Sequence, residues 1–140
     1  LPVRFCRADL SLGWPFAAGS FELLTANLVL EHIQELDFIF GEARRVLVEG
    51  GRFYLSELHP FRQYQGKKAV YRQEGEIREI TAFVHHLSDF LEAAARNGFG
   101  LLELKEWWHE ADQGKPPRLV GLLWRHEIAA GGSGAHHELG

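Results

Sequence analysis

The 140-residue chain contains a single cysteine and no methionine. Because Cys6 is the only thiol, the chain can form neither an internal disulfide nor a zinc cluster built on cysteines. Low cysteine content is typical of the reducing cytoplasm, where we expect the protein to be located. An initiator methionine normally stays in front of a bulky residue such as Leu1. We therefore expect that Leu1 is not the biological N-terminus.

Excess positive charge and long apolar runs are also lacking. The chain has 15 Lys and Arg residues against 19 Asp and Glu residues, a formal net charge of −4. This balance argues against nucleic acid as a partner, because nucleic-acid affinity depends on basic patches. No apolar run approaches the roughly 20 residues needed to cross a bilayer, and no signal peptide is visible, so we expect no membrane partner. Hydrophobic residues make up 46% of the chain, which indicates one globular domain.

The middle of the chain predicts a strand, a helix and a second strand. The apolar run over 21–28 follows the turn residues 18–20 and indicates a strand buried on both faces. Apolar residues at helical spacing predict an amphipathic helix over 35–48, ended by Gly50-Gly51 and followed by a strand over 52–58. A helix that links two strands favours a parallel pair. In open sheets of this kind, ligands bind beyond the carboxyl ends of the strands.

Further elements are predicted on both sides of this unit. Residues 3–8 alternate apolar and basic side chains, as expected of a short edge strand. Residues 59–80 form a polar excursion with a small hairpin around Glu74-Gly75-Glu76, which is suitably placed to form a lid or substrate wall.

The C-terminal part predicts one more helix and two more strands. The helix begins after the N-cap Ser88 and ends at Asn97-Gly98. Strands are predicted over 101–108 and 119–126, and the Gly-rich residues 128–140 are predicted to be a flexible tail.

An ordered set of motifs runs through these elements: Asp9, Trp14-Pro15-Phe16, Gly19-Ser20-Phe21-Glu22-Leu23, Asn27-Leu28-Val29-Leu30-Glu31-His32, and the helix with its glycine turn over 43–53. This set resembles the class I S-adenosylmethionine-dependent methyltransferases, in particular the type 11 methyltransferase domain. The resemblance covers residues 3–127, so 1–127 is predicted to be a partial methyltransferase domain. It implies an α/β fold with a Rossmann-like sheet, mostly parallel with an antiparallel closing strand.

The resemblance implies cofactor contacts at matched positions. In the family, an acidic residue that ends the third strand accepts a hydrogen bond from the adenine amino group, and here that residue is Asp9. The backbone of Leu10 would face the adenine ring, Asn27 and Leu28 would contact the methionine part, and His32 would lie near the transferred methyl group. Two simpler roles stay open: Asp9 also fits a residue that starts a turn, and Asn27 fits a buried amide bonded to backbone.

One part of the family pattern is missing. The family has a glycine-rich turn after its first strand, and an acidic residue at the end of its second strand that holds the ribose. Glycine is needed at that turn because the backbone approaches the ligand closely. The resemblance therefore implies that the first two strands are absent at the N-terminus. With its neighbours missing, the strand over 3–8 leaves an open sheet flank, so we expect a homo-oligomer or a strand-swapped assembly. We also expect this fragment alone to be inactive.

Three more histidines are candidate substrate contacts. His59 follows the end of a strand, and His85 and His86 precede the second helix, where a neutral imidazole could accept a proton from a substrate. His85 and His86 also fit solvated residues at a helix entry. His32 and His85 are the candidates for a catalytic role. Glu31-His32 lacks the His-x-x-x-His spacing of a zinc helix, so no metal site is predicted.

The sequence thus predicts transfer of a methyl group from S-adenosylmethionine to a small-molecule or carrier-bound acceptor in the complete protein. Such a transfer depends on in-line alignment more than on strong acid–base groups. By family analogy, one possible reaction is carboxyl methylation of an acid on an acyl-carrier protein. Two alternatives remain. The first is a non-catalytic methyltransferase-like module for binding or dimerisation. The second is half of a nicotinamide-dependent dehydrogenase, for which the glycine turn and a Tyr-x-x-x-Lys pair are lacking.

Overall fold

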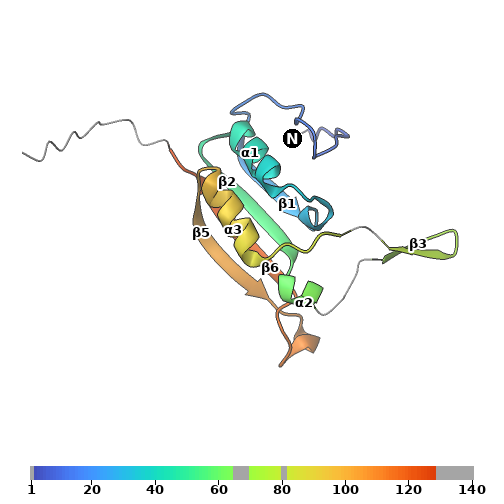
Figure 1. Ribbon diagram of the computed structural model, residues 1–140. Helices are drawn as coiled ribbons and strands as arrows, with labels where there is room; N and C mark the ends of the chain where they lie inside the picture. The colour runs from blue at the N-terminus through green and yellow to red at the C-terminus, as the bar shows by residue number, and fades with distance from the viewer. Residues whose placement is uncertain (1, 65–69, 80–81, 129–140) are drawn as a thin grey trace, which may run out of the picture.

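The computed structural model describes residues 2–64, 70–79 and 82–128, and a four-stranded sheet with the order β1-β2-β6-β5 lies at its centre (Figure 1). The strands are β1 (Phe21–Asn27), β2 (Leu47–Leu58), β5 (Phe99–Trp107) and β6 (Leu119–His126). β1 and β2 are parallel, whereas β6 is antiparallel to both of its neighbours, β2 and β5. Three of these four strands therefore run in one direction and the closing strand runs against them. This arrangement confirms the predicted α/β sheet.

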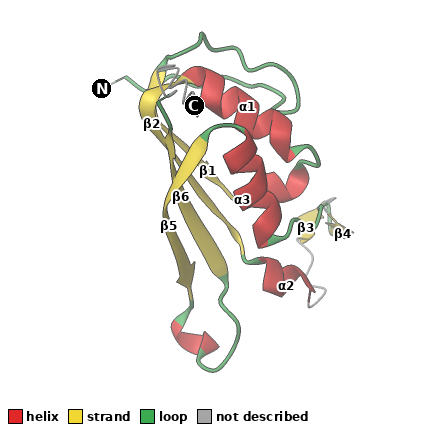
Figure 2. Cartoon of the chain, turned by 60° about the vertical axis from the view of Figure 1, so that its left-hand side comes forward, coloured by secondary structure: helices red, strands yellow, loops and turns green. Residues whose placement is uncertain are grey.

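Two helices cover one face of this sheet. They are α1 (Leu36–Val46) and α3 (Leu87–Arg96), which lie side by side in both views (Figures 1 and 2). No described helix covers the opposite face (Figure 2). The smaller elements are the turns η1 (Leu30–His32) and η2 (Glu110–Asp112), the helix α2 (Pro60–Tyr64) and the hairpin of β3 (Val70–Gln73) and β4 (Glu76–Glu79).

The core between helices and sheet is built around one aromatic ring. Phe40 of α1 is fully buried, and its ring packs edge to face against Phe53, Phe99 and Trp124, with centroids 5.4, 6.0 and 5.1 Å away. These three partners come from β2, β5 and β6. A single helix residue thus joins three strands, and edge-to-face geometry is the favoured arrangement of aromatic pairs.

The connection from α1 to β2 differs from its prediction. The helix ends at Val46 and β2 begins at Leu47, so Gly50-Gly51 lies within the strand and does not end the helix. The register with β1 is irregular here. Phe21 pairs with Leu47 and Leu23 pairs with Arg52, so β2 has extra residues between these two pairs. Gly50 has a φ of +76°, and a Cβ on Gly51 would lie 2.8 Å from the carbonyl oxygen of Val48. The two glycines therefore serve a tight bulge.

The predicted edge strand over 3–8 is wrong. These residues form no strand, and Val3 and Phe5 are 74% and 93% exposed. A strand needs a neighbour to satisfy its backbone N–H and C=O groups, and no described strand pairs with this segment.

Most of the C-terminal elements are found where they were predicted, although the strand predicted over 101–108 spans Phe99–Trp107 and one helix cap differs. The last strand is observed as predicted, and Asn97 and Gly98 end α3, with Gly98 at a φ of +75°. The predicted N-cap Ser88 is wrong. The helix begins two residues earlier, at Leu87, and His86 is the N-cap, whose backbone N–H donates to Asp89 Oδ2 over 2.7 Å.

The predicted polar excursion over 59–80 contains the predicted hairpin. Glu74 and Gly75 both have positive φ values, 53° and 80°, as a two-residue turn between antiparallel strands requires. The helix α2 at the start of this excursion was not predicted. The predicted tail lies outside the described residues from 129 onward.

Candidate functional site

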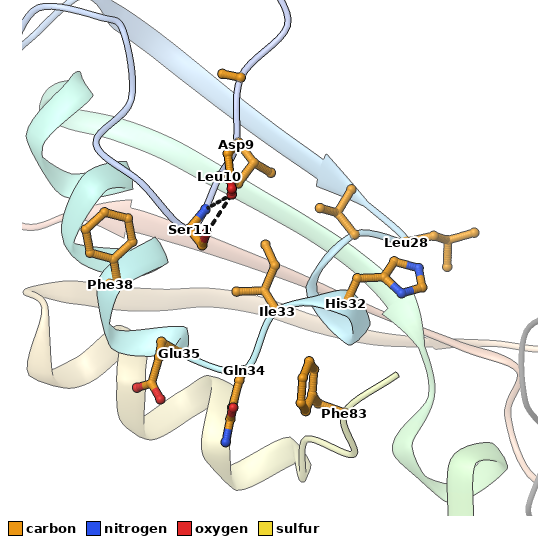
Figure 3. Close-up of a pocket in the computed structure, with 12 residues that line it drawn as sticks. Asp9, Leu10, Ser11, Leu28, His32, Ile33, Gln34, Glu35, Phe38 and Phe83 are labelled. Carbon is orange, nitrogen blue, oxygen red and sulfur yellow. Dashed lines mark hydrogen bonds between the residues drawn. The ribbon is translucent and has the colours of Figure 1, made fainter. Parts of the chain in front are cut away.

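A pocket of about 620 Å³ lies beside the carboxyl end of β1. Segments that are far apart in the sequence build it (Figure 3): the N-terminal segment, the residues after β1, the start of α1, and Phe83 in the segment that leads to α3. We call residues 28–33 the rim, because four of them line the pocket. The described lining residues are Ala8, Asp9, Leu10, Ser11, Leu28, Val29, His32, Ile33, Gln34, Glu35, Phe38 and Phe83. The size and the mainly apolar lining are typical of small-ligand sites.

The rim begins with a strained residue. Leu28 has a φ of +52°, a left-handed conformation that is unfavourable for a residue with a branched side chain. Its N–H donates to the carbonyl oxygen of Ser56 over 2.9 Å, so β2 holds the strained residue in place. Strain of this kind is concentrated at functional sites, which agrees with the exposure of Leu28 to the pocket.

The opposite wall is built on a turn made by Asp9. Its Oδ1 accepts hydrogen bonds from the N–H of Ser11 over 2.9 Å and from the Ser11 hydroxyl over 2.6 Å (Figure 3). These bonds, the hydroxyl bond above all, lower the pKa of the Asp9 carboxyl. Asp9 is therefore ionised at neutral pH and starts a turn, the simpler of its two predicted roles, while also lining the pocket.

Four of the five predicted cofactor contacts come together in this pocket. Asp9 and Leu10 lie on one wall, and Leu28 and His32 lie on the rim (Figure 3). Asn27 is the last residue of β1 and is exposed, but it is not among the lining residues. Their roles toward a cofactor stay predictions.

The other three predicted histidines do not line the pocket. His59 Nε2 lies 2.6 Å from Glu106 Oε2, and its Nδ1 accepts the N–H of Phe61, so both ring nitrogens are used within the protein. His86 caps α3 and bonds the Tyr64 hydroxyl through Nδ1.

His85 lies directly behind the rim. Its Nε2 is 2.6 Å from the carbonyl oxygen of Ile33, and a carbonyl can only accept, so the proton is on Nε2. The ring is 8% exposed and packs edge to face against Phe90. The structure therefore assigns His85 a contact with the rim backbone, behind the pocket wall.

Sequence reasoning missed several residues of the site. Phe38 lies outside the buried stripe of α1, and an exposed aromatic residue on the polar face of a helix was the signal that could have found it. Phe83 reaches the pocket through tertiary contact, because its N–H donates to the carbonyl oxygen of Glu31 over 2.6 Å. Glu57 was also missed, although it continues the buried alternation of Phe53 and Leu55 along β2.

The charges around the pocket are mainly negative. Asp9 and Glu35 line it together with His32, and no Lys or Arg is among the described lining residues. A positively charged or neutral polar ligand therefore suits this lining better than an anion does. Within the described part of the chain, no group of three or more His, Cys, Asp or Glu side chains could hold a metal ion. No helix among the described residues is both long and apolar enough to cross a membrane.

Comparisons with known sequences place most of the pocket in a known domain. A family model described as a methyltransferase domain matches residues 1–55, which include the N-terminal wall, the rim and the start of α1. The malonyl-[acyl-carrier protein] O-methyltransferase of Methylovorus sp. is 32% identical over 85 residues, which are 61% of this chain and 28% of that protein. The chain thus spans little more than a quarter of this relative.

Solved structures show the same fold. An S-adenosylmethionine-dependent methyltransferase from Mesorhizobium loti matches with a TM-score of 0.70 and 19% identity, over 86% of this chain and 68% of that one. A putative one from Listeria monocytogenes matches with a TM-score of 0.69 and 16% identity, over 82% and 65%. The [4+2]-cyclase SpnF matches with a TM-score of 0.63 and 16% identity, over 89% and 57%. The chain is thus similar over residues 1–55 to a methyltransferase domain, and it shares the fold of S-adenosylmethionine-dependent methyltransferases of known structure.

Proposed function

We propose that the pocket binds the adenine end of S-adenosylmethionine, and that the complete protein transfers the methyl group of this cofactor to a small-molecule or carrier-bound acceptor. One observation carries the proposal. Asp9, Leu10, Leu28 and His32 were predicted to contact the cofactor from the sequence alone, and all four line one pocket.

The lining fits an adenine ring. Leu10 and Phe38 supply apolar surface for the faces of a flat ring, and Leu28 lies on the rim, where the resemblance assigns it to the methionine part. Asp9 Oδ1 is used by the turn, whereas its Oδ2 has no partner among the described residues and can accept a hydrogen bond from the adenine amino group. A charged acceptor strengthens such a bond.

The lining suits the sulfonium group of the cofactor but offers no charged partner for its carboxylate. When bound, S-adenosylmethionine supplies an electrophilic methyl group on a sulfonium cation, and the negative charges of Asp9 and Glu35 favour a cation in this pocket. The cofactor's carboxylate requires a cation or a cluster of backbone N–H groups. The described lining residues offer neither a Lys nor an Arg for it.

The acceptor class rests on the sequence relationship. The Methylovorus relative acts, by its name, on a malonyl group carried by an acyl-carrier protein. A carrier-bound carboxylic acid is therefore the first acceptor to test.

Calorimetric titration of S-adenosylhomocysteine into the chain tests the cofactor site. Asp9→Asn is the informative variant, because the amide oxygen can keep the turn with Ser11 while the amide nitrogen cannot accept from adenine. We expect at least a tenfold loss of affinity, the usual effect of losing a hydrogen bond to a charged group. Glu22→Gln, exposed at the far end of β1, is the control and should bind normally. Equal affinities of Asp9→Asn and the native chain would contradict the proposal.

We also propose a second candidate function, a module for binding or dimerisation, which the open parts of the sheet favour. β1 lies at an edge of the described sheet, no described helix covers the face opposite α1 (Figure 2), and Leu23 on β1 is 58% exposed. Unpaired strand edges and apolar sheet faces favour association, so we propose a homo-oligomer or a strand-swapped assembly. Light scattering after size-exclusion chromatography should give at least twice the mass of the chain. A stable monomer at micromolar concentration would refute the assembly.

A further inference from the structure

We infer that Glu57 is a positioning residue, whose buried carboxylate fixes the rim of the pocket in its ligand-binding shape. This inference rests on the proposed function of the pocket, and it adds a residue that neither the sequence motifs nor the comparisons indicated.

Glu57 lies on β2 directly behind the rim. Its side chain is on the helix-covered side of the sheet with Phe53 and Leu55, and it is 2% exposed. Its Oε1 accepts the N–H groups of two consecutive rim residues, Val29 over 3.1 Å and Leu30 over 2.9 Å. One carboxylate oxygen thus satisfies two backbone donors at the start of η1. Bonds of this kind to an ionised acceptor are stronger than those between neutral groups.

The rim needs such an anchor because it begins in an unfavourable conformation. Leu28 has a φ of +52°, and a non-glycine residue keeps this conformation only where its surroundings impose it. Ser56 accepts the N–H of Leu28, and the next residue, Glu57, accepts those of Val29 and Leu30. Two successive residues of β2 therefore hold three successive residues of the rim.

The far end of the rim is held as well. The carbonyl oxygen of Ile33 accepts the Nε2 proton of His85. Between these two anchors lie the lining residues Leu28, Val29 and His32, so the position of the wall depends on both. Glu57 acts on the pocket through the backbone it binds and does not itself line the pocket.

The chemistry of the position supports a positioning role over a purely stabilising one. Glu57 Oε2 is buried and has no hydrogen-bond partner in the described structure, which is unfavourable for folding. The pKa of Glu57 is raised, mainly because the carboxyl group is buried. The hydrogen bonds from Leu30 and Val29 and the nearby His32 lower the pKa, whereas the negative charge of Glu31 raises it further. A leucine would continue the apolar alternation of β2 without this cost. What the carboxylate adds is the pair of acceptor bonds to the rim.

Three variants of the chain test the inference with two measurements. Glu57→Leu removes both acceptor bonds at similar size, and Glu57→Gln keeps an Oε1 carbonyl that can accept both. Glu49→Leu is the matched control, an exposed glutamate on the same strand. The first measurement is backbone amide hydrogen exchange by NMR at Val29 and Leu30, with Leu122 of β6 as the internal reference for global opening. The second is the affinity for S-adenosylhomocysteine by calorimetry.

We expect Glu57→Leu to exchange at least tenfold faster at Val29 and Leu30, with Leu122 unchanged, and to bind S-adenosylhomocysteine at least tenfold more weakly. Glu57→Gln should recover most of both values, and Glu49→Leu should match the native chain. Native exchange at the two rim amides, or native affinity in Glu57→Leu, overturns the inference.

Two further outcomes are also decisive. Should Glu57→Leu fail to fold, Glu57→Asp replaces it, because its carboxylate is one methylene shorter; faster rim exchange then supports the inference and unchanged exchange overturns it. Should the native chain not bind S-adenosylhomocysteine, the proposed function of the pocket fails. The role of Glu57 in the rim is then decided by the exchange rates alone.

Discussion

Of two phenylalanines on α1, one lies in the core and the other lines the pocket. Phe40 is fully buried, whereas Phe38, two residues earlier, is 38% exposed and lines the pocket. Replacing each by alanine removes the same number of atoms from two different environments. The first replacement should affect the free energy of unfolding, and the second should affect ligand binding.

The magnitudes follow from the contacts of each ring. Removing a buried phenylalanine side chain typically costs about 3–5 kcal/mol. Phe40 makes three edge-to-face contacts, each worth about 0.5–1.5 kcal/mol beyond burial, so we expect the upper half of that range. Phe40→Leu keeps most of the volume and should cost about 1–2 kcal/mol. Phe38→Ala should cost less than about 1 kcal/mol, because a half-exposed side chain leaves no core cavity.

Urea unfolding followed by far-UV circular dichroism measures these differences. A loss of about 4–5 kcal/mol is a large part of the total stability of a typical domain, about 5–15 kcal/mol, so Phe40→Ala should be partly unfolded without denaturant. Phe38→Ala should unfold at nearly the native midpoint but bind S-adenosylhomocysteine several times more weakly. Equal destabilisation by Phe38→Ala and Phe40→Ala, or a loss below about 1 kcal/mol for Phe40→Ala, would refute this description of the core.

Two further predictions concern stability. The hydrogen bond from Arg118 lowers the pKa of Asp112 to about 2. The ionised Asp112 carboxylate therefore stabilises the fold above the ordinary carboxyl pKa, and this stabilisation is lost as the pH falls from about 4 to about 2. Asp112→Asn should therefore be less stable at pH 7 and show a flatter loss over that acid range in urea midpoints, and an unchanged acid profile would contradict this. Gly98→Ala should cost about 1–2 kcal/mol by the same assay, because Gly98 has a φ of +75° and an added Cβ would also collide with Arg44. Native stability of Gly98→Ala would contradict the left-handed helix end.

Periodicity predicted most of the regular elements because apolar runs and helical spacing are properties of neighbouring residues. The apolar runs of β1 and β6 and the helical spacing of α1 marked these elements correctly. The predicted burial of β1 on both faces is wrong, because no residue of β1 is fully buried and burial depends on what packs against the strand. Gly50-Gly51 shows where such reasoning fails. A glycine pair ends a helix or makes a strand bulge equally well, and the choice depends on the pairing of β2 with β1, which the local sequence does not contain.

The segment over 3–8 is a second prediction that failed for want of a partner. Its alternation is that of a strand, but a strand forms only beside another strand, and no described strand pairs with it. Local pattern and tertiary partner must both be present.

The site was predictable where a family motif marks it. Asp9 and His32 belong to such motifs and line the pocket. Phe83 and Glu57 reach the site through contacts with residues 31 and 29–30, across more than 25 positions of sequence, and no local pattern encodes those contacts. Outside the pocket, Arg62 is 5% exposed because of a similarly distant partner: its Nη2 lies 3.3 Å from Asp112 Oδ2.

We propose that this chain provides the adenine side of a cofactor pocket but not the side that holds the methionine carboxylate. Calorimetric titration of the chain with adenosine and, separately, with S-adenosylhomocysteine distinguishes the two sides. If the claim holds, the two ligands bind with affinities within about threefold, because the amino-acid part of the larger ligand finds no charged partner among the described lining residues. A preference for S-adenosylhomocysteine of more than about thirtyfold, which is about 2 kcal/mol, would contradict it.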